Sequence, residues 1–219
     1  QEYLDLFPGP MPERRRYALA MLAAVDAGVG RIVQKLESYG IDDDTLIVFM
    51  GDNGAPLNLT KKDVLPVSAQ TAPNGGSVWD GSLNEPWIGE KGMLSEGGIR
   101  VPFIMRWKNH LPEGLVYQEP VISIDASTTA AALAGLTTAD MDGINLIPYL
   151  KNPTAKPNRA LYWRFMQQAA VRQGKWKYLR TADEGEYLFD LSSDQHEKVN
   201  LLTQHPAISQ TLDTQLSKW

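Results

Sequence analysis

In TLIVFMGDNG, residues 45–54, a run of uncharged residues stops at a carboxylate, an amide and two glycines, and the expected fold follows from this pattern. Its first six residues are β-branched, aliphatic or aromatic, which predicts a strand covered on both faces. Gly51 and Gly54 let the backbone turn tightly around Asp52 and Asn53. In open α/β sheets, ligands bind beyond the carboxyl ends of strands, so this turn stands where a binding site is expected.

Asp52 and Asn53 could serve as metal ligands. A carboxylate oxygen and an amide oxygen are hard donors, which suit calcium or magnesium better than zinc. The alternative is that Asp-Asn-Gly only turns the chain, because Asx and Gly are the usual turn residues. Residues 45–54 alone leave both interpretations open.

A second segment, GEKGMLSEGGIRVPFI at residues 89–104, favours the binding-site interpretation. Together, the Asp52-Asn53-Gly54 turn, Lys91 and EGGIRVP at residues 96–102 closely resemble the sulfatase family, which belongs to the alkaline phosphatase-like superfamily. Further segments in the family's order extend the resemblance over nearly the whole chain. They are residues 14–40, WKYL at 176–179, YLFDL at 187–191 and the tract 194–201.

The resemblance implies roles for three residues. Asp52 and Asn53 match two of the family's metal ligands, and Lys91 matches its sulfate-binding lysine. The metal would be Ca²⁺, with Mg²⁺ as the alternative, acting as Lewis acid and template. Read in isolation, Lys91 would be an ordinary solvated loop residue, and only its spacing ahead of EGGIRVP changes that interpretation. Glu96 and Arg100 are expected to pair and brace the loop rather than to react.

The resemblance also points to what these residues lack. Sulfatases use a formylglycine nucleophile made from the first residue of a Cys/Ser-x-Pro-x-Arg motif in the N-terminal half. This sequence has no cysteine, and none of its serines begins such a motif. Residues 1–7 resemble the segment just after the family's substrate-binding Pro-His-x-Pro stretch. We therefore expect a C-terminal fragment, inactive alone, whose partner is the missing N-terminal half of the same protein.

Alternating helix and strand patterns predict an α/β fold. Apolar residues from Ala18 to Leu36 recur at steps of three and four, which makes one helical face that Gly40 ends. Helices and strands are expected at residues 14–40, 45–50, 101–107, 121–124 and 125–133. Such interleaving implies a mostly parallel sheet. Residues 1–155 are therefore interpreted as the C-terminal half of an alkaline phosphatase-like domain.

A second domain is expected at residues 156–219. The Pro- and Asn-containing tract at 151–158 indicates a linker. The short strand-like runs that follow, separated by tight turns, predict an antiparallel meander. Ile208, Leu212 and Leu216 recur at steps of four and predict a helix that covers one face of this sheet. This α+β subdomain would be structural support for the catalytic domain, with a minor role at the rim of the cleft as the alternative.

The intervening tract, residues 53–98, is rich in proline and glycine and shows no regular pattern. Long irregular loops in compact domains are often functional. One interpretation places four of its residues along a substrate cleft. They are Trp79, Asn84, Glu85 and Trp87. The alternative is that the two tryptophans hold the loop in place by burial.

Composition excludes several function classes. A net charge of −5 argues against nucleic-acid binding, and no uncharged apolar run approaches the length that spans a bilayer, so no membrane partner is expected. The absence of cysteine excludes disulfides and zinc–thiolate sites. Residues 1–12 do not form a signal peptide. By resemblance, the full-length protein is expected in the periplasm or outside the cell.

The expected activity is sulfate monoester hydrolysis by a metal-bound formylglycine in the absent half. The substrate would be a sulfated small molecule or a sulfated glycan, and the sequence does not select between them. One alternative is a phosphonate monoester or phosphodiester hydrolase of the same superfamily, which shares these motifs. Another is a non-catalytic, truncated module that binds an oxyanion.

Overall fold

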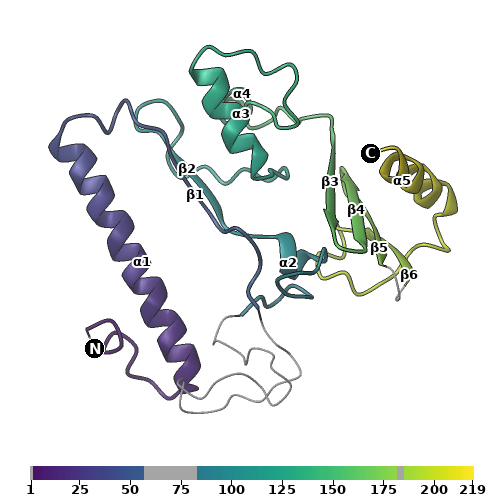
Figure 1. Cartoon of the computed structure of the whole chain (residues 1–219), viewed down its shortest axis with the longest axis horizontal. Helices are drawn as coiled ribbons and strands as arrows, with labels where there is room; N and C mark the ends of the chain where they lie inside the picture. Colours follow the sequence, from purple (N-terminus) through teal and green to yellow (C-terminus); the bar gives the residue numbers. More distant parts are fainter. Residues whose placement is uncertain (1, 57–82, 182–184) are drawn as a thin grey trace.

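The computed structural model describes residues 2–56, 83–181 and 185–219 (Figure 1). It contains an N-terminal portion of helices and one strand pair, and a C-terminal sheet with its own helix. The elements of the first portion are α1 (Glu13–Ser38), β1 (Ile47–Met50), α2 (Glu96–Ile99), β2 (Phe103–Arg106), α3 (Ile124–Leu133) and α4 (Ile147–Lys151). Those of the second are β3 (Ala160–Phe165), β4 (Gln168–Gln173), β5 (Trp176–Thr181), β6 (Gly185–Asp190) and α5 (Pro206–Lys218).

Strands β1 and β2 form one antiparallel pair, from Ile47 opposite Arg106 to Met50 opposite Phe103. Both strands were expected from the sequence, with slightly wider bounds. Every strand pair in the described part of the chain is antiparallel, so the described residues do not themselves form the mostly parallel sheet expected from the sequence. Phe49 and Met50 are both exposed, so β1 is not covered on both faces by the described residues.

The predicted strand at residues 121–124 is wrong. Residues 121 and 122 are irregular, and Ile124 is already the first residue of α3. The Asp125 side chain accepts a hydrogen bond from the Ile122 amide at 2.9 Å, which turns the chain directly into the helix. A short apolar run has the same composition whether it becomes a strand, a buried turn or a helix start, so the pattern could not separate them.

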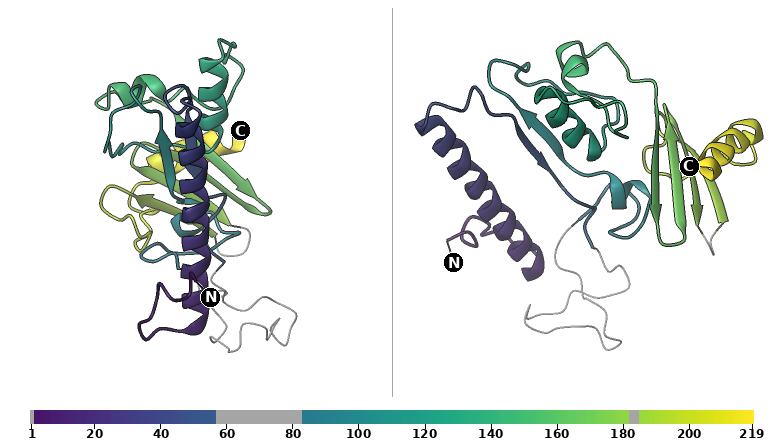
Figure 2. Two further views of the ribbon diagram at one scale, coloured as in Figure 1. Left: turned by 90° about the vertical axis from the view of Figure 1, so that its left-hand side faces the viewer. Right: turned by 45° about the horizontal axis from the view of Figure 1, so that its top comes forward.

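Helix α1 has the predicted bounds but an uncovered apolar face. Gly40 follows it with φ +65, the left-handed conformation typical just after a helix. Leu22 and Ile32 on the apolar face are each 61% exposed. Figures 1 and 2 show α1 standing apart from the strands and the other helices. An apolar face of this kind is normally buried against another element.

Contrary to the expectation from sequence, α1 is long and apolar enough to cross a membrane, judged by length and composition alone. The core helix of a soluble protein can meet the same criterion, and we assign no membrane span.

The C-terminal sheet confirms the predicted meander. Strands β3 to β6 are neighbours in chain order and all pair antiparallel. Helix α5 covers one face, as expected, and inserts Leu212 and Leu216 between side chains of β4, β5 and β6. Tyr178, Val171 and Leu188 are fully buried beneath it. This packing gives the sheet a core of its own.

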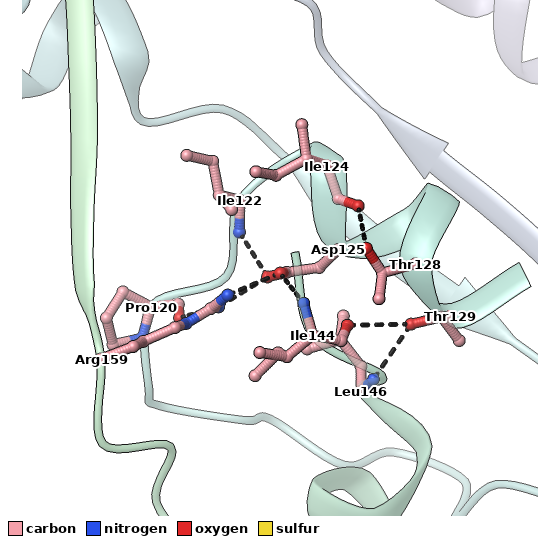
Figure 3. A network of polar contacts seen from close by, with 9 residues as sticks. All are labelled: Pro120, Ile122, Ile124, Asp125, Thr128, Thr129, Ile144, Leu146 and Arg159. Carbon is pink, nitrogen blue, oxygen red and sulfur yellow. Dashed lines mark hydrogen bonds and ion pairs between the residues drawn. The ribbon is translucent and has the colours of Figure 1, made fainter. Parts of the chain in front are cut away.

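A buried ion pair joins the two portions (Figure 3). Arg159, the residue before β3, reaches both carboxylate oxygens of Asp125 on α3 at 2.6 Å. The same carboxylate, which is fully buried, accepts hydrogen bonds from the amides of Ile122 and Ile144 at 2.9 Å. Four donors compensate one buried charge, as burial of a charge requires. The first strand of the meander is thereby attached to α3. The domain boundary after residue 155 stays a prediction.

Candidate functional site

The Asp52–Asn53 turn lies directly after β1 and is held by backbone contacts. The Gly51 amide donates to Pro102 at 3.0 Å, and the Gly54 amide donates to Gly98 at 2.8 Å. A Cβ atom at Gly54 would overlap the carbonyl of Gly97. Only glycine allows this close approach, so the local sequence ties the turn to the α2 segment.

The turn leaves two oxygen ligands available. Asp52 accepts a hydrogen bond only from the neighbouring Asn53 amide, at 3.0 Å, and it has no cationic partner in the described part of the chain. The Asn53 side-chain NH₂ donates to Gly54 at 3.0 Å, while its oxygen accepts no hydrogen bond from a described residue. One exposed carboxylate and one amide oxygen side by side fit a hard divalent cation. Residues 2–56, 83–181 and 185–219 contain no group of three or more His, Cys, Asp or Glu side chains that could hold a metal, so this turn would supply part of a coordination shell.

The structure brings Lys91 to the same place. Its backbone amide donates to Ala55 at 3.2 Å, directly after the turn. Lys91, Asp52 and Asn53 all line one cleft of about 1340 Å³. Across the described ranges, the Lys91 side chain has no hydrogen-bond or ion-pair partner, so its charge is available to an anion. The three residues predicted from the sequence therefore line the same cleft.

The loop residues predicted to line the cleft have another role. The Asn84 amide group accepts from the Ala55 amide at 2.8 Å and donates to the carbonyls of Ala55 and Gly89 at 2.9 and 3.0 Å. It thereby joins the segment after the turn to the loop before Lys91. Asn84 and Glu85 do not line the cleft, so that prediction is wrong for both. The Asn84 side chain instead pairs with both the amide and the carbonyl of Ala55.

Trp87 holds its loop in place, which supports the burial interpretation. The Arg100 guanidinium carbon lies 3.9 Å from the centroid of its ring, and the His196 ring lies 5.5 Å away. Trp87 is half-buried and does not line the cleft. Trp79 lies outside the described residues.

A buried charge cluster braces the loop that follows Lys91. Glu96 and Arg100 are 3.6 Å apart, which confirms the predicted pairing. Lys177 on β5, which is fully buried, lies 2.9 Å from Glu96 and 2.7 Å from Glu197. Glu197 also accepts from the Glu96 amide at 2.6 Å. Burial raises the pKa of Glu197, while the Lys177 ammonium lowers it. Arg172 stands 4.0 Å from Glu96, so three cations face two carboxylates.

Lys177 and Glu197 are functional neighbours that sequence reasoning missed. Both belong to segments recognised by resemblance, but a single charged residue in a strand or turn normally faces solvent. The one available signal was the position of Lys177 within a short apolar strand. A lysine there can be buried only if carboxylates inside the protein compensate its charge. That compensation comes from residues 81 and 20 positions away, which the sequence could not pair.

The C-terminal sheet forms the other wall of the cleft. Its contributions are aromatic and cationic side chains from β3, β4, β5 and the turns between them. They are Trp163, Phe165, Arg172, Lys175 and Trp176. The sequence interpretation gave this sheet a supporting role, because its side chains reach the cleft only through the folded arrangement.

Two family models match the chain. The Sulfatase model matches residues 5–136, and the model of the C-terminal region of N-sulphoglucosamine sulphohydrolase matches residues 85–219. Among curated relatives, human N-acetylgalactosamine-6-sulfatase is 32% identical over 168 residues, covering 75% of this chain and 29% of the relative. Human arylsulfatase A is 30% identical over 211 residues, covering 83% of this chain and 38% of the relative.

Solved structures agree in fold. Ps i-CgsB in complex with k-i-k-neocarrahexaose is 31% identical with a TM-score of 0.82, covering 100% of this chain and 46% of that chain. The phosphonate monoester hydrolase of Agrobacterium radiobacter, 23% identical, shares the fold with a TM-score of 0.65, covering 93% of this chain and 40% of that chain. The chain thus spans less than half the length of these relatives. The α/β fold class expected from the sequence is confirmed.

Proposed function

This chain belongs to the sulfatase family, and we propose that it is the C-terminal part of a sulfuric ester hydrolase. In this proposal it contributes two metal ligands and the sulfate-binding lysine to the active site. The observation that carries the proposal is that Asp52, Asn53 and Lys91 line one cleft, each with its polar end available.

The chemistry of a sulfate monoester fits these groups. Its sulfuryl oxygens carry charge, and the bridging oxygen must leave with a further charge. A Ca²⁺ or Mg²⁺ ion held by Asp52 and Asn53 would supply Lewis acidity at the sulfuryl oxygens. Because the amide ligand adds no charge, the site keeps its attraction for an anion. Lys91 offers a compact positive charge to a sulfuryl oxygen or to the leaving oxygen.

The nucleophile would come from polypeptide outside these 219 residues. By family resemblance it is a formylglycine in an N-terminal half that packs against the chain described above. Uncovered apolar side chains on α1 and on the β1–β2 pair support this, including Leu22, Ile32 and Ile104.

The cleft favours a sulfated glycan over a small sulfate ester. Trp163 and Phe165 provide flat apolar surfaces, and Arg172 adds a cation on the same wall. The related Ps i-CgsB is in complex with k-i-k-neocarrahexaose. Export to the periplasm or out of the cell is part of the same proposal and still has to be measured.

The decisive experiment uses the complete protein from its native host. Lys91→Ala should lower kcat/KM for an aryl sulfate by about 10²–10³-fold, the usual loss on removing one charge-stabilising donor. Lys198→Ala, an exposed lysine away from the cleft, is the matched control and should leave kcat/KM unchanged. Absence of sulfate ester turnover by the wild-type complete protein would contradict the proposed function.

A phosphonate monoester hydrolase is the second candidate, favoured by the likeness in fold to the enzyme of Agrobacterium radiobacter. Asp52, Asn53 and Lys91 would serve either reaction, because both substrates are tetrahedral oxyanion esters. Comparing kcat/KM for an aryl sulfate with that for an aryl phosphonate separates the two. Peptide mapping of the native polypeptide separates an active sulfatase from a truncated oxyanion-binding module, since the module should lack the mass change of a formylglycine.

A further inference from the structure

Gln168, a side chain of the C-terminal sheet, forms two hydrogen bonds to the loop that carries Lys91. The Gln168 carboxamide NH₂ donates to the Gly92 carbonyl at 2.9 Å. Its oxygen accepts from the Leu94 amide at 3.1 Å. Both partners lie within three residues of Lys91, so the first residue of β4 is bound twice to the backbone that sets the position of this lysine.

The tip of the β3–β4 hairpin completes the contact. Phe165, the last residue of β3, has its ring 3.6 Å from the place where a Cβ atom of Gly92 would stand. Gly92 itself has φ +92, a conformation that a residue with a side chain rarely adopts. On the opposite side, the Lys91 amide is bound to Ala55, two residues after Asn53. The Lys91 backbone is therefore held between the metal-ligand turn and the hairpin.

We propose that Gln168 is a positioning residue for Lys91, which rests on the function proposed above. The Lys91 side chain has no partner of its own among the described residues, so the location of its charge depends on where the backbone holds it. A flexible four-carbon stem adds freedom of its own, and catalytic groups lose activity steeply when misplaced by about 1 Å. The paired hydrogen bonds of Gln168 restrict the backbone at Gly92 and Leu94, which line the cleft directly after Lys91.

Gln168 is a sharper test than the buried Lys177. Removing Lys177 would leave Glu96 and Glu197 buried without their counter-charge, and the protein would lose stability for that reason alone. Gln168 is only half-buried, so water can satisfy the Gly92 carbonyl and the Leu94 amide in its absence. An effect of Gln168 on catalysis can then be separated from an effect on folding.

The test compares Gln168→Ala with Gln167→Ala in the complete enzyme. Gln167 is the exposed neighbour in the hairpin turn and forms no hydrogen bond within the described part of the chain, so it is the matched control. We expect Gln168→Ala to lower kcat/KM for an aryl sulfate about tenfold, as a small misplacement of a catalytic group does. Calcium affinity and Tm should stay as in the wild type. Gln168→Glu keeps an acceptor for the Leu94 amide but loses the donor for the Gly92 carbonyl. Its kcat/KM should lie between that of the wild type and that of Gln168→Ala.

The double variant Gln168→Ala/Lys91→Ala decides whether Gln168 acts through Lys91. Groups that act through one another are not additive, so Gln168→Ala should have no further effect once Lys91 is absent. Equal losses in both backgrounds, or no loss in the single variant, would overturn the inference while leaving the sulfatase proposal intact. A wild-type enzyme without sulfate ester turnover would overturn both. If Gln168→Ala folds poorly, the same comparison is made with Gln168→Glu.

Discussion

At the residue scale, glycines decide how close the two halves of the site can approach. Gly54 lies against Gly97 and Gly98, and a Cβ atom at any of the three would overlap a nearby backbone carbonyl. The glycines in these motifs are therefore packing requirements as much as turn signals. They place the ligand turn directly on the α2 segment, and so fix the distance from Asp52 and Asn53 to the loop of Lys91.

Gly54→Ala tests this requirement. The added methyl group must displace the Gly97 carbonyl or the turn itself, so we expect the calcium affinity of the complete protein to fall together with its activity. Isothermal titration with calcium measures the first and aryl sulfate turnover the second. Gly30→Ala in α1 is the control, since a Cβ atom there meets nothing within 4 Å. The helix interior should gain about 0.5–1 kcal/mol from that change. Unaltered calcium binding in Gly54→Ala would show that the turn can adjust.

Charged residues read as solvated surface can also be structural. The acidic run at residues 42–44 resembles an exposed turn in sequence, but Asp42 is buried and accepts from Lys108 at 2.8 Å. The Lys108 hydrogen bond holds the pKa of Asp42 below its usual value of 3.8, and the pKa of Lys108 is raised in turn. The partner lies 66 residues away, so the sequence around Asp42 could not reveal that this carboxylate is buried.

The lowered pKa makes a prediction about pH. A carboxyl group whose pKa is lower in the folded state stabilises the protein above its unfolded pKa, and this contribution is lost as pH falls through the folded pKa. The stabilisation from Asp42 is thus present above about pH 3.8 and lost in more acidic solution. In Asp42→Asn, the free energy of unfolding should be lower than in the wild type at neutral pH. It should also decline less than in the wild type as the pH falls below about 3.8. Asp44→Asn, which alters an exposed carboxylate, should follow the wild type. Parallel acid profiles for wild type and Asp42→Asn would contradict the assignment.

At the element scale, periodic patterns predicted the regular elements well. The bounds of α1, the positions of β1 and β2, and the four-stranded meander with its covering helix all match their sequence signals. The signals failed where an element is defined by one tertiary contact. Residues 121–123 form a turn into α3 rather than a strand, because Asp125 accepts from the Ile122 amide and is itself bound by Arg159. Neither partner can be inferred from a four-residue apolar run.

The β3–β4 hairpin shows how an element acquires a second role. Its strands belong to the core of the C-terminal sheet, yet its tip binds the Lys91 loop through Gln168. The buried Lys177 on the next strand, β5, binds Glu96 from the same side. The sheet therefore supports the site at two points of one loop, which explains why a subdomain without an obvious catalytic residue would stay attached to this cleft.

At the scale of the whole molecule, the uncovered faces predict opposite effects of one substitution. Ile32→Asp places a charge in the exposed apolar face of α1. In the 219-residue chain alone it should reduce self-association, because a smaller apolar patch remains in water. In the complete protein it should destabilise the fold, because the charge would be buried. Light scattering measures the first effect and thermal unfolding the second.

Gln34→Asp, on an exposed polar position of the same helix, is the control and should change neither measurement strongly. A complete protein that tolerates Ile32→Asp without loss of Tm would show that this face stays in water. The chain alone should also lack sulfatase turnover, because it holds the lysine and two ligands but no nucleophile.

The sequence alone predicted the family, the order of most elements and three candidate site residues, which the fold brings to one cleft. Short motifs of glycine, carboxylate, amide and lysine carry that information locally, and local backbone conformation follows from the same residues. The side chains that hold the Lys91 loop emerged only from the tertiary structure. Gln168, Lys177 and Glu197 bind residues 92–96 of this loop across 74 to 101 positions of the chain. Contacts of that separation depend on how two sheets meet, and no periodicity along the chain encodes it.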